Sequence, residues 1–216
     1  MIPTFVSPVA KEDLEPILEY LSEHNLGINK YRKKVGEGIS QTIGIVSKRC
    51  LAPDISRHTW LHPKLFYFLQ EFGKKYVMPH ISYTSIQVNV NFSCKKHKDV
   101  NNVGNSYIVA FGDFVGGDLT IEDKRYDIKE KGLLFNGSEL EHCTEPFLGN
   151  RISIVYHSLM PISRWGTMIP QIANFESFLD EGGQWKLRRL SDGKILDKKN
   201  PLPHPLLKRQ LLPSIQ

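Results

Sequence analysis

The feature that most constrains the fold is a run of short segments, between residues 83 and 160, in which apolar and polar residues alternate. This period of two is typical of half-buried strands. The clearest segments are Ser85–Phe92, Ser106–Phe111, Asp118–Ile121, Gly132–Phe135 and Arg151–His157. Turn-forming pairs such as Gly116-Gly117 and Asn136-Gly137 separate them. Short, closely spaced strands without intervening helices indicate an antiparallel sandwich or barrel rather than a parallel α/β sheet.

Helical patterns flank this run on its N-terminal side. Residues 11–24 and 63–76 carry apolar side chains at helical spacing and predict two amphipathic helices. Beyond residue 160 the strand pattern fades, with a helical turn expected at 174–179 and a hairpin at 185–196. We therefore expect a helical flank over 1–82, a strand-rich core over 83–160 and a C-terminal extension over 161–216.

The C-terminal extension is basic. The chain of 216 residues has a formal net charge of +5, and residues 184–216 contain eight Lys or Arg against two Asp, a net +6. The preceding 183 residues therefore sum to −1. A basic segment of this kind can approach a polyanion, most commonly nucleic acid, with strongly salt-dependent binding. A solvated tail is the alternative that the charge count leaves open.

Other features exclude several classes of protein. No apolar run approaches the roughly 18 residues that a membrane-spanning helix requires, so no membrane partner is expected. Three scattered cysteines are too few for a disulfide framework or a CxxC zinc site. The N-terminus lacks the pattern of a secretory signal. We expect an intracellular protein of a reducing compartment, nucleus or cytoplasm, that acts as a monomer.

Two histidines and an aspartate carry the chemistry. His97 and Asp99 are two residues apart, so in an extended chain their side chains leave the same face. This pair alone is a weak signal, but His142 follows 45 residues later, just after a strand and a turn. Nine residues further on, Arg151 and Ser153 share one face of a strand, opposite the apolar face.

This set of residue types suits a non-haem iron site. Two His and one carboxylate hold Fe(II) and leave its other positions open, whereas a structural zinc would normally have a fourth protein ligand. The planar guanidinium of Arg151 can bind the far carboxylate of a 2-oxo diacid through two hydrogen bonds, with the Ser153 hydroxyl beside it. The pattern predicts a site for Fe(II) and 2-oxoglutarate.

The longer text around these residues resembles one family. The segments that carry the likeness are residues 97–109, 112–119, 135–137, 142–147 and 149–153, beginning HKDVNNVGNSYIV and ending GNRIS. They are similar to the Fe(II)/2-oxoglutarate-dependent dioxygenases, in the compact TET/JBP-like branch of protists, fungi, algae and viruses. The resemblance covers about residues 40–158. It implies an α+β fold with a double-stranded β-helix (jelly roll, cupin-like) core and flanking N-terminal helices.

The resemblance also implies roles for individual residues and the cofactors Fe(II), 2-oxoglutarate and O2. The implied catalytic iron ligands are His97, Asp99 and His142. The implied co-substrate residues are Arg151, Ser153 and Asn89, with Asn91 as a further candidate. The implied substrate-binding residues are Asn102 and His157, where the family pattern is matched less closely. Cys143, next to a ligand, is expected to point away from the metal.

The family oxidises the 5-methyl group of pyrimidine bases in nucleic acid. The leading hypothesis is a dioxygenase acting on 5-methylcytosine, or less favourably thymine, in DNA rather than RNA. A base in a duplex would have to be flipped into the pocket, and the basic extension could hold flanking phosphates. The alternatives are a 2-oxoglutarate-dependent hydroxylase of a protein side chain or small molecule, and a catalytically silent jelly-roll module that binds nucleic acid.

Overall fold

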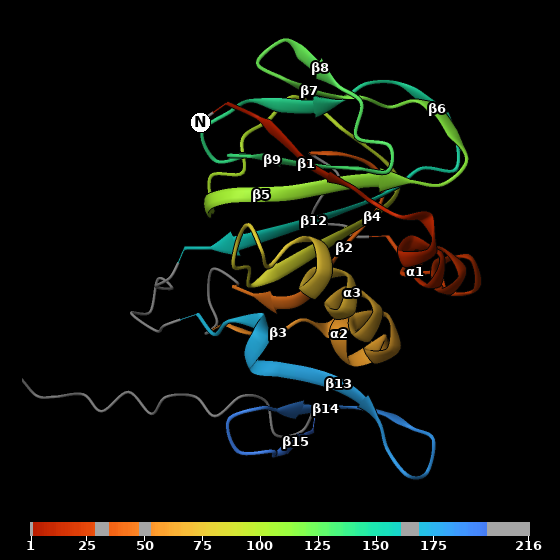
Figure 1. Ribbon diagram of the computed structural model, residues 1–216, viewed down its shortest axis with the longest axis vertical. Helices are drawn as coiled ribbons and strands as arrows, with labels where there is room; N and C mark the ends of the chain where they lie inside the picture. Colours follow the sequence, from red (N-terminus) through yellow and green to blue (C-terminus); the bar gives the residue numbers. More distant parts are fainter. Residues whose placement is uncertain (1, 29–34, 48–52, 161–168, 198–216) are drawn as a thin grey trace, which may run out of the picture.

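Two facing layers of antiparallel strands form the centre of the molecule (Figure 1). The structure is a computed structural model and describes residues 2–28, 35–47, 53–160 and 169–197. Its main sheet has seven strands in the order β1-β9-β5-β12-β4-β2-β3, all paired antiparallel. Their bounds are β1 Thr4–Pro8, β9 Lys131–Phe135, β5 Asn102–Phe111, β12 Ile152–Leu159, β4 Ser85–Cys94, β2 Gly36–Val46 and β3 Asp54–Ile55.

The facing layer consists of two small sheets, one of order β10-β7-β8 and one of order β11-β6. The bounds of these strands are β10 His142–Thr144, β7 Leu119–Ile121, β8 Lys124–Tyr126, β11 Phe147–Gly149 and β6 Phe114–Gly116. Buried side chains from both layers, among them Ile108, Leu119 and Phe135, form one apolar cluster between them. The arrangement confirms the predicted α+β fold with a double-stranded β-helix core.

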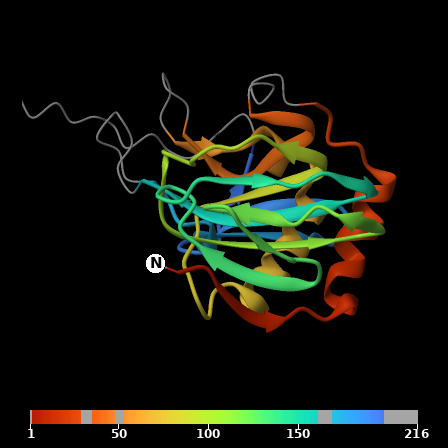
Figure 2. The ribbon, with the colours of Figure 1, turned by 90° about the horizontal axis from the view of Figure 1, so that it is seen from above.

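Helices cover the other face of the main sheet. They are α1 Lys11–Glu23, α2 Arg57–Leu61 and α3 Pro63–Tyr76, and α1 lies at one end of the strands when the molecule is seen from above (Figure 2). Their buried apolar side chains, including Ile17, Leu65 and Leu69, pack with Ile86 and Ile154 of the sheet. The observed helices match the two predicted amphipathic patterns to within a residue, because an apolar stripe at this spacing needs a sheet or helix to cover it.

The N-terminal segment contributes more than helices. Residues 1–82, expected as a helical flank, also supply β1, β2 and β3 to the main sheet. Where β2 pairs with β4, the register shifts by one residue between Glu37 and Ile39. Opposite this bulge Asn91 has φ 49° and Gly38 has φ 110°. A Cβ on Gly38 would lie 2.2 Å from the Asn91 carbonyl oxygen, so only glycine fits there.

The C-terminal extension forms a third small sheet. After the 3-10 turn η2 (Ile172–Asn174), strands β13 (Phe175–Leu179), β14 (Trp185–Arg189) and β15 (Ile195–Leu196) pair in sequence. The hairpin predicted at 185–196 is confirmed. The helical turn expected at 174–179 is wrong, because only its first residue is helical and the rest pairs with β14. The Gln70 amide joins this sheet to α3 by donating to the Phe175 carbonyl at 2.6 Å.

Three of the four basic side chains in the described part of the basic segment form ion pairs. On β14, Lys186 Nζ lies 2.5 Å from Asp180 Oδ2, and Arg188 pairs with Glu176. Arg189 Nη2 lies 2.5 Å from Asp192 Oδ2. Residues 198–216, which hold the other half of the predicted basic segment, lie outside the described residues. Among the described residues no helix is long and apolar enough to cross a membrane.

Candidate iron and 2-oxoglutarate site

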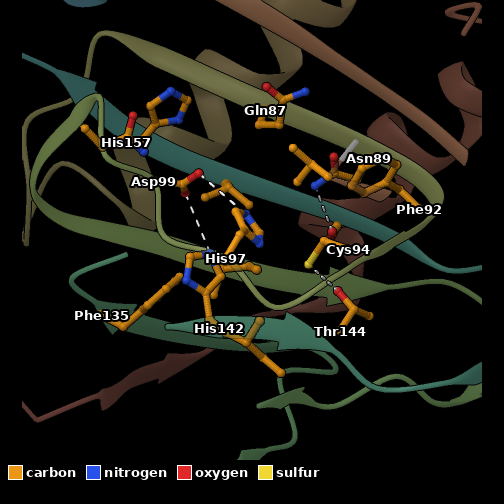
Figure 3. A pocket seen from close by; sticks show the side chains of 16 residues that line it. Gln87, Asn89, Phe92, Cys94, His97, Asp99, Phe135, His142, Thr144 and His157 are labelled. Carbon is orange, nitrogen blue, oxygen red and sulfur yellow. Dashed lines mark hydrogen bonds and ion pairs between the residues drawn. The ribbon is translucent and has the colours of Figure 1, made fainter. Parts of the chain in front are cut away.

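The three predicted metal ligands come together between the two layers (Figure 3). His97 and Asp99 follow the end of β4, and His142 begins β10. The backbones of His97 and His142 form an isolated bridge, with both N–H groups donating to the partner carbonyl at 3.0 Å. The Asp99 N–H donates to the Gly137 carbonyl at 2.8 Å, so the Asn136-Gly137 turn also fixes the carboxylate.

The geometry of these side chains is that of a metal site. One ligand atom from each residue lies within 4.8 Å of the others. His97 Nε2 is 3.6 Å from Asp99 Oδ1, and His142 Nε2 is 3.7 Å from Asp99 Oδ2. The opposite ring nitrogens, Nδ1 of His97 and of His142, lie 2.7 Å and 3.0 Å from the carbonyls of Lys95 and Leu140. Donation there leaves each Nε2 lone pair facing the carboxylate.

Electrostatics favour the protonation states that a metal requires. Burial lowers the pKa of His142, with the Leu140 carbonyl and Asp99 opposing it, so the neutral imidazole is favoured. Burial alone would raise the pKa of Asp99, but its interactions with the side chains of His97, His142 and His157 outweigh burial. The net result is a lowered pKa and an ionised carboxylate. The set can therefore bind a divalent cation at neutral pH.

Arg151 immediately precedes β12 and is buried. Its side chain is 2% exposed, and its guanidinium lies over the rings of Phe114 and Phe147. Nε donates to the Gly117 carbonyl at 3.2 Å, whereas Nη2 has no hydrogen-bond partner among the described residues. Burial lowers the pKa of Arg151 to about 10. A buried guanidinium with an unused N–H donor can bind an anion, which accepts the hydrogen bond.

Polar side chains of the main sheet join this region to the metal ligands. The predicted co-substrate residues Asn89 and Ser153 are opposite each other on β4 and β12, and Asn89 Nδ2 donates to Ser153 Oγ at 3.2 Å. Ser40 Oγ donates to Asn89 Oδ1 at 2.6 Å. Asn89 and Ser153 line the pocket that contains the triad. The Ser153 hydroxyl is therefore held in place by the Asn89 amide.

The predicted substrate-binding residues line the same pocket. Asn102 and His157 both face it, and Figure 3 shows His157 beyond Asp99, away from Cys94 and Thr144. Gln87 lies beside them and was not anticipated. Its amide is held in place because Nε2 donates to Ser40 Oγ at 2.9 Å and Oε1 accepts from Thr42. Alternation along β4 would have found Gln87, which is two residues before Asn89.

Asn91, one of the candidate residues, departs from simple alternation along β4. Asn91, a further co-substrate candidate, does not line the pocket, because the bulge turns it outward and its Oδ1 accepts from the Arg151 N–H at 2.8 Å. After the bulge Phe92 and Cys94 line the pocket instead. Cys143 is not among the described residues that line it, as expected.

Comparisons with known proteins place the fold. No protein-family model matches the chain, and no curated protein matches it. The chain is similar to the structure of NgTET1 in complex with 5mC DNA, with a TM-score of 0.51 and 17% identity, over 73% of this chain and 72% of that one. At this identity the likeness shows the fold alone, and it agrees with the predicted double-stranded β-helix core.

Two further solved structures are similar at lower scores. One is a Pseudomonas putida prolyl-4-hydroxylase, with a TM-score of 0.46 and 10% identity over 73% of this chain and 92% of that one. The other is an oxidoreductase of the 2OG-Fe(II) oxygenase family from Burkholderia pseudomallei. Its TM-score is 0.46 and its identity 14%, over 72% of this chain and 82% of that one.

Proposed function

We propose that this protein is an Fe(II)- and 2-oxoglutarate-dependent dioxygenase that oxidises the 5-methyl group of a pyrimidine base, 5-methylcytosine before thymine, in DNA. The observation that carries the enzyme class is the triad itself. Ligand atoms of His97, Asp99 and His142 lie within 4.8 Å of one another, with both imidazoles oriented by backbone carbonyls. Two nitrogens and one carboxylate leave open positions for a co-substrate and oxygen.

The remaining residues fit the co-substrate. The Nη2 of Arg151 supports an anionic ligand, because it is a buried donor without a partner among the described residues. Arg151 would hold the far carboxylate of 2-oxoglutarate, with Ser153 and Asn89 lining the approach. Bound Fe(II), with 2-oxoglutarate and O2, supplies the oxidising power to break an unactivated C–H bond. The protein holds the target carbon near the metal and excludes bulk water.

The substrate proposal depends on the polar end of the pocket. Gln87, Asn102 and His157 offer amide and imidazole groups suited to the hydrogen-bonding edge of a flipped base. NgTET1, which shares the fold, was solved with 5mC DNA. Residues 198–216 carry four of the basic side chains that could contact phosphates.

The test is mass spectrometry of nucleosides from methylated and unmethylated duplex DNA after incubation with Fe(II), 2-oxoglutarate and ascorbate. We expect oxidised 5-methylcytosine with the native protein and none with the His97→Ala/Asp99→Ala variant. Succinate release that depends on the triad, without a modified base, would keep the enzyme class and refute the DNA substrate. Absence of both would favour the silent binding module.

One observation favours the alternative, hydroxylation of a protein side chain or small molecule. The Lys and Arg side chains on β14 are paired with Asp and Glu, so this part of the extension offers little free positive charge to DNA. Stimulation of succinate release distinguishes the substrates. Duplex DNA should stimulate it under the main proposal, whereas peptides or metabolites should do so under the alternative.

A further inference from the structure

An exposed apolar surface lies beside the polar end of the pocket, which Asn102 and His157 line. It consists of Val100, Val103 and Met160, whose relative exposures are 67%, 43% and 53%. The two valines lie on either side of Asn102 in the sequence, and Met160 directly follows β12. None of the three is among the described residues that line the pocket, so this surface, which we call the lip, belongs to its rim.

Backbone hydrogen bonds hold the lip in place. The start of β5 pairs with the end of β12, with Asn102 opposite Leu159 (Figure 1). The Met160 N–H donates to the Asn101 carbonyl at 3.2 Å. The Asn102 N–H donates to the carbonyl of Asp99, a candidate metal ligand, at 2.8 Å. The backbone of the lip is therefore fixed relative to the metal site.

A positive charge lies next to the lip in the sequence. Lys98 is exposed and comes two residues before Val100. Lys96 pairs with Asp123 and Glu141, whereas Lys98 enters no ion pair among the described residues. Lysine side chains of this kind contact DNA phosphates. An apolar surface with a cation at its edge suits DNA, because the faces of the bases are apolar and the backbone is anionic.

We propose that the lip enters duplex DNA at the flipped base and covers the neighbouring base pair that flipping exposes. This inference rests on the proposed function. Extrusion of a base breaks its stacking and its pairing. Proteins that kink DNA insert apolar side chains between base steps and so cover the unstacked faces. The residues that would receive the base and the lip lie side by side, so both contacts can form together.

The experiment compares paired with unpaired DNA. Fluorescence anisotropy on the Mn(II)-loaded protein without 2-oxoglutarate gives Kd for 5-methylcytosine in a duplex and in a single strand of the same length. Val100→Ser and Met160→Ser should each weaken duplex binding by about tenfold, because each removes one apolar side chain from the stack. Binding to the single strand should change by less than about twofold, because no base pair is broken there.

A second readout follows the stacking directly. 2-Aminopurine beside the 5-methylcytosine fluoresces more strongly when its stacking neighbour leaves, so the native protein should raise the emission, and Val103→Ser should reduce this rise. The controls are Val115→Ser and Leu148→Ser, at side chains that are 79% and 81% exposed and opposite each other on β6 and β11, outside the lip. They should change neither Kd nor emission. Circular dichroism and Mn(II) affinity confirm that each variant folds and loads.

The outcomes separate this inference from the proposed function. Losses in the lip variants that are confined to the duplex support it. Equal losses on duplex and single strand, or equal losses in the two control variants, refute insertion into the stack. If the native protein oxidises 5-methylcytosine but the lip variants bind the duplex as well as it does, the lip fails alone. If the native protein binds no DNA, the proposed DNA substrate fails and the lip with it.

Discussion

Replacing Arg151 with methionine should have opposite effects on the empty protein and on its co-substrate complex. Arg151→Met keeps the length and apolar volume of the side chain but removes the charge. In the empty protein the guanidinium is 2% exposed, with Nη2 unpartnered among the described residues. Its burial is offset only in part, by the Gly117 carbonyl, by two aromatic rings and by weaker charge interactions with Cys94 and Asp118.

The size of the expected gain in stability follows from the pKa of Arg151. Burial lowers the pKa of Arg151 from 12.5 to about 10. Such a shift corresponds to a cost of roughly 3 kcal/mol for the charged form. Because the folded-state pKa is below the unfolded-state value, this cost is fully present at neutral pH and is relieved only above about pH 10. Subtracting about 1 kcal/mol for the lost hydrogen bond, Arg151→Met should raise the free energy of unfolding by about 1 to 2 kcal/mol.

Urea unfolding at pH 7.5, with and without 2-oxoglutarate on the Mn(II)-loaded protein, measures both effects. A ligand at one hundred times its Kd stabilises the native protein by about 2.7 kcal/mol, and Arg151→Met should lose this increment. Arg125, whose side chain is 69% exposed beside Glu145, gives the control: Arg125→Met should change either value by less than about 1 kcal/mol. An empty Arg151→Met protein that is less stable than the native one would refute the reasoning.

Three other results are expected. A Cβ on Gly137 would lie 3.2 Å from Cε1 of the His142 imidazole, a candidate metal ligand. Gly137→Ala should therefore weaken Mn(II) binding by about 10- to 100-fold in calorimetry. Gly182→Ala, in a distant loop, should leave Mn(II) binding unchanged. The free energy of unfolding of the metal-free protein, measured in urea, should fall as the pH falls below 6.5. Burial lowers the pKa of His58, His62 and His142, so these side chains bind protons more readily in the unfolded chain. An unfolding free energy that stays constant between pH 7.5 and 5.5 would contradict this. Truncation after Asp197 removes four basic residues, so the slope of log K against log salt for duplex DNA should fall by up to roughly 3 to 4, while an unchanged slope would place the phosphate contacts elsewhere.

The metal site was predictable because its residues obey simple rules. His97 and Asp99 are two residues apart on extended backbone, and Arg151, Ser153 and His157 alternate along one strand. Period-two alternation determines the face of each side chain wherever a strand is regular. The two longer helices were predictable in the same way, because their apolar side chains recur at the helical spacing of three to four residues.

Residues beyond an irregularity were not predictable in this way. The bulge at Asn91 inserts one residue into β4, so Asn91 leaves the pocket and Cys94 enters it. The signal is Gly38, whose role depends on a strand 50 residues away and so cannot be read locally. The C-terminal strand β13 was missed because its five residues, FESFL, alternate weakly and are stabilised by pairing with β14 and by Gln70.

The backbone bridge between His97 and His142 has a consequence for how the protein would respond to its metal. The two residues are 45 positions apart and exchange both of their peptide hydrogen bonds. A divalent ion held by both imidazoles would bind only the folded protein, because the unfolded chain does not hold these ligands together. Such an ion stabilises the folded state by mass action, by about 2.7 kcal/mol at one hundred times its Kd. The supply of the metal would then set the stability of the folded protein as well as any reaction at the site.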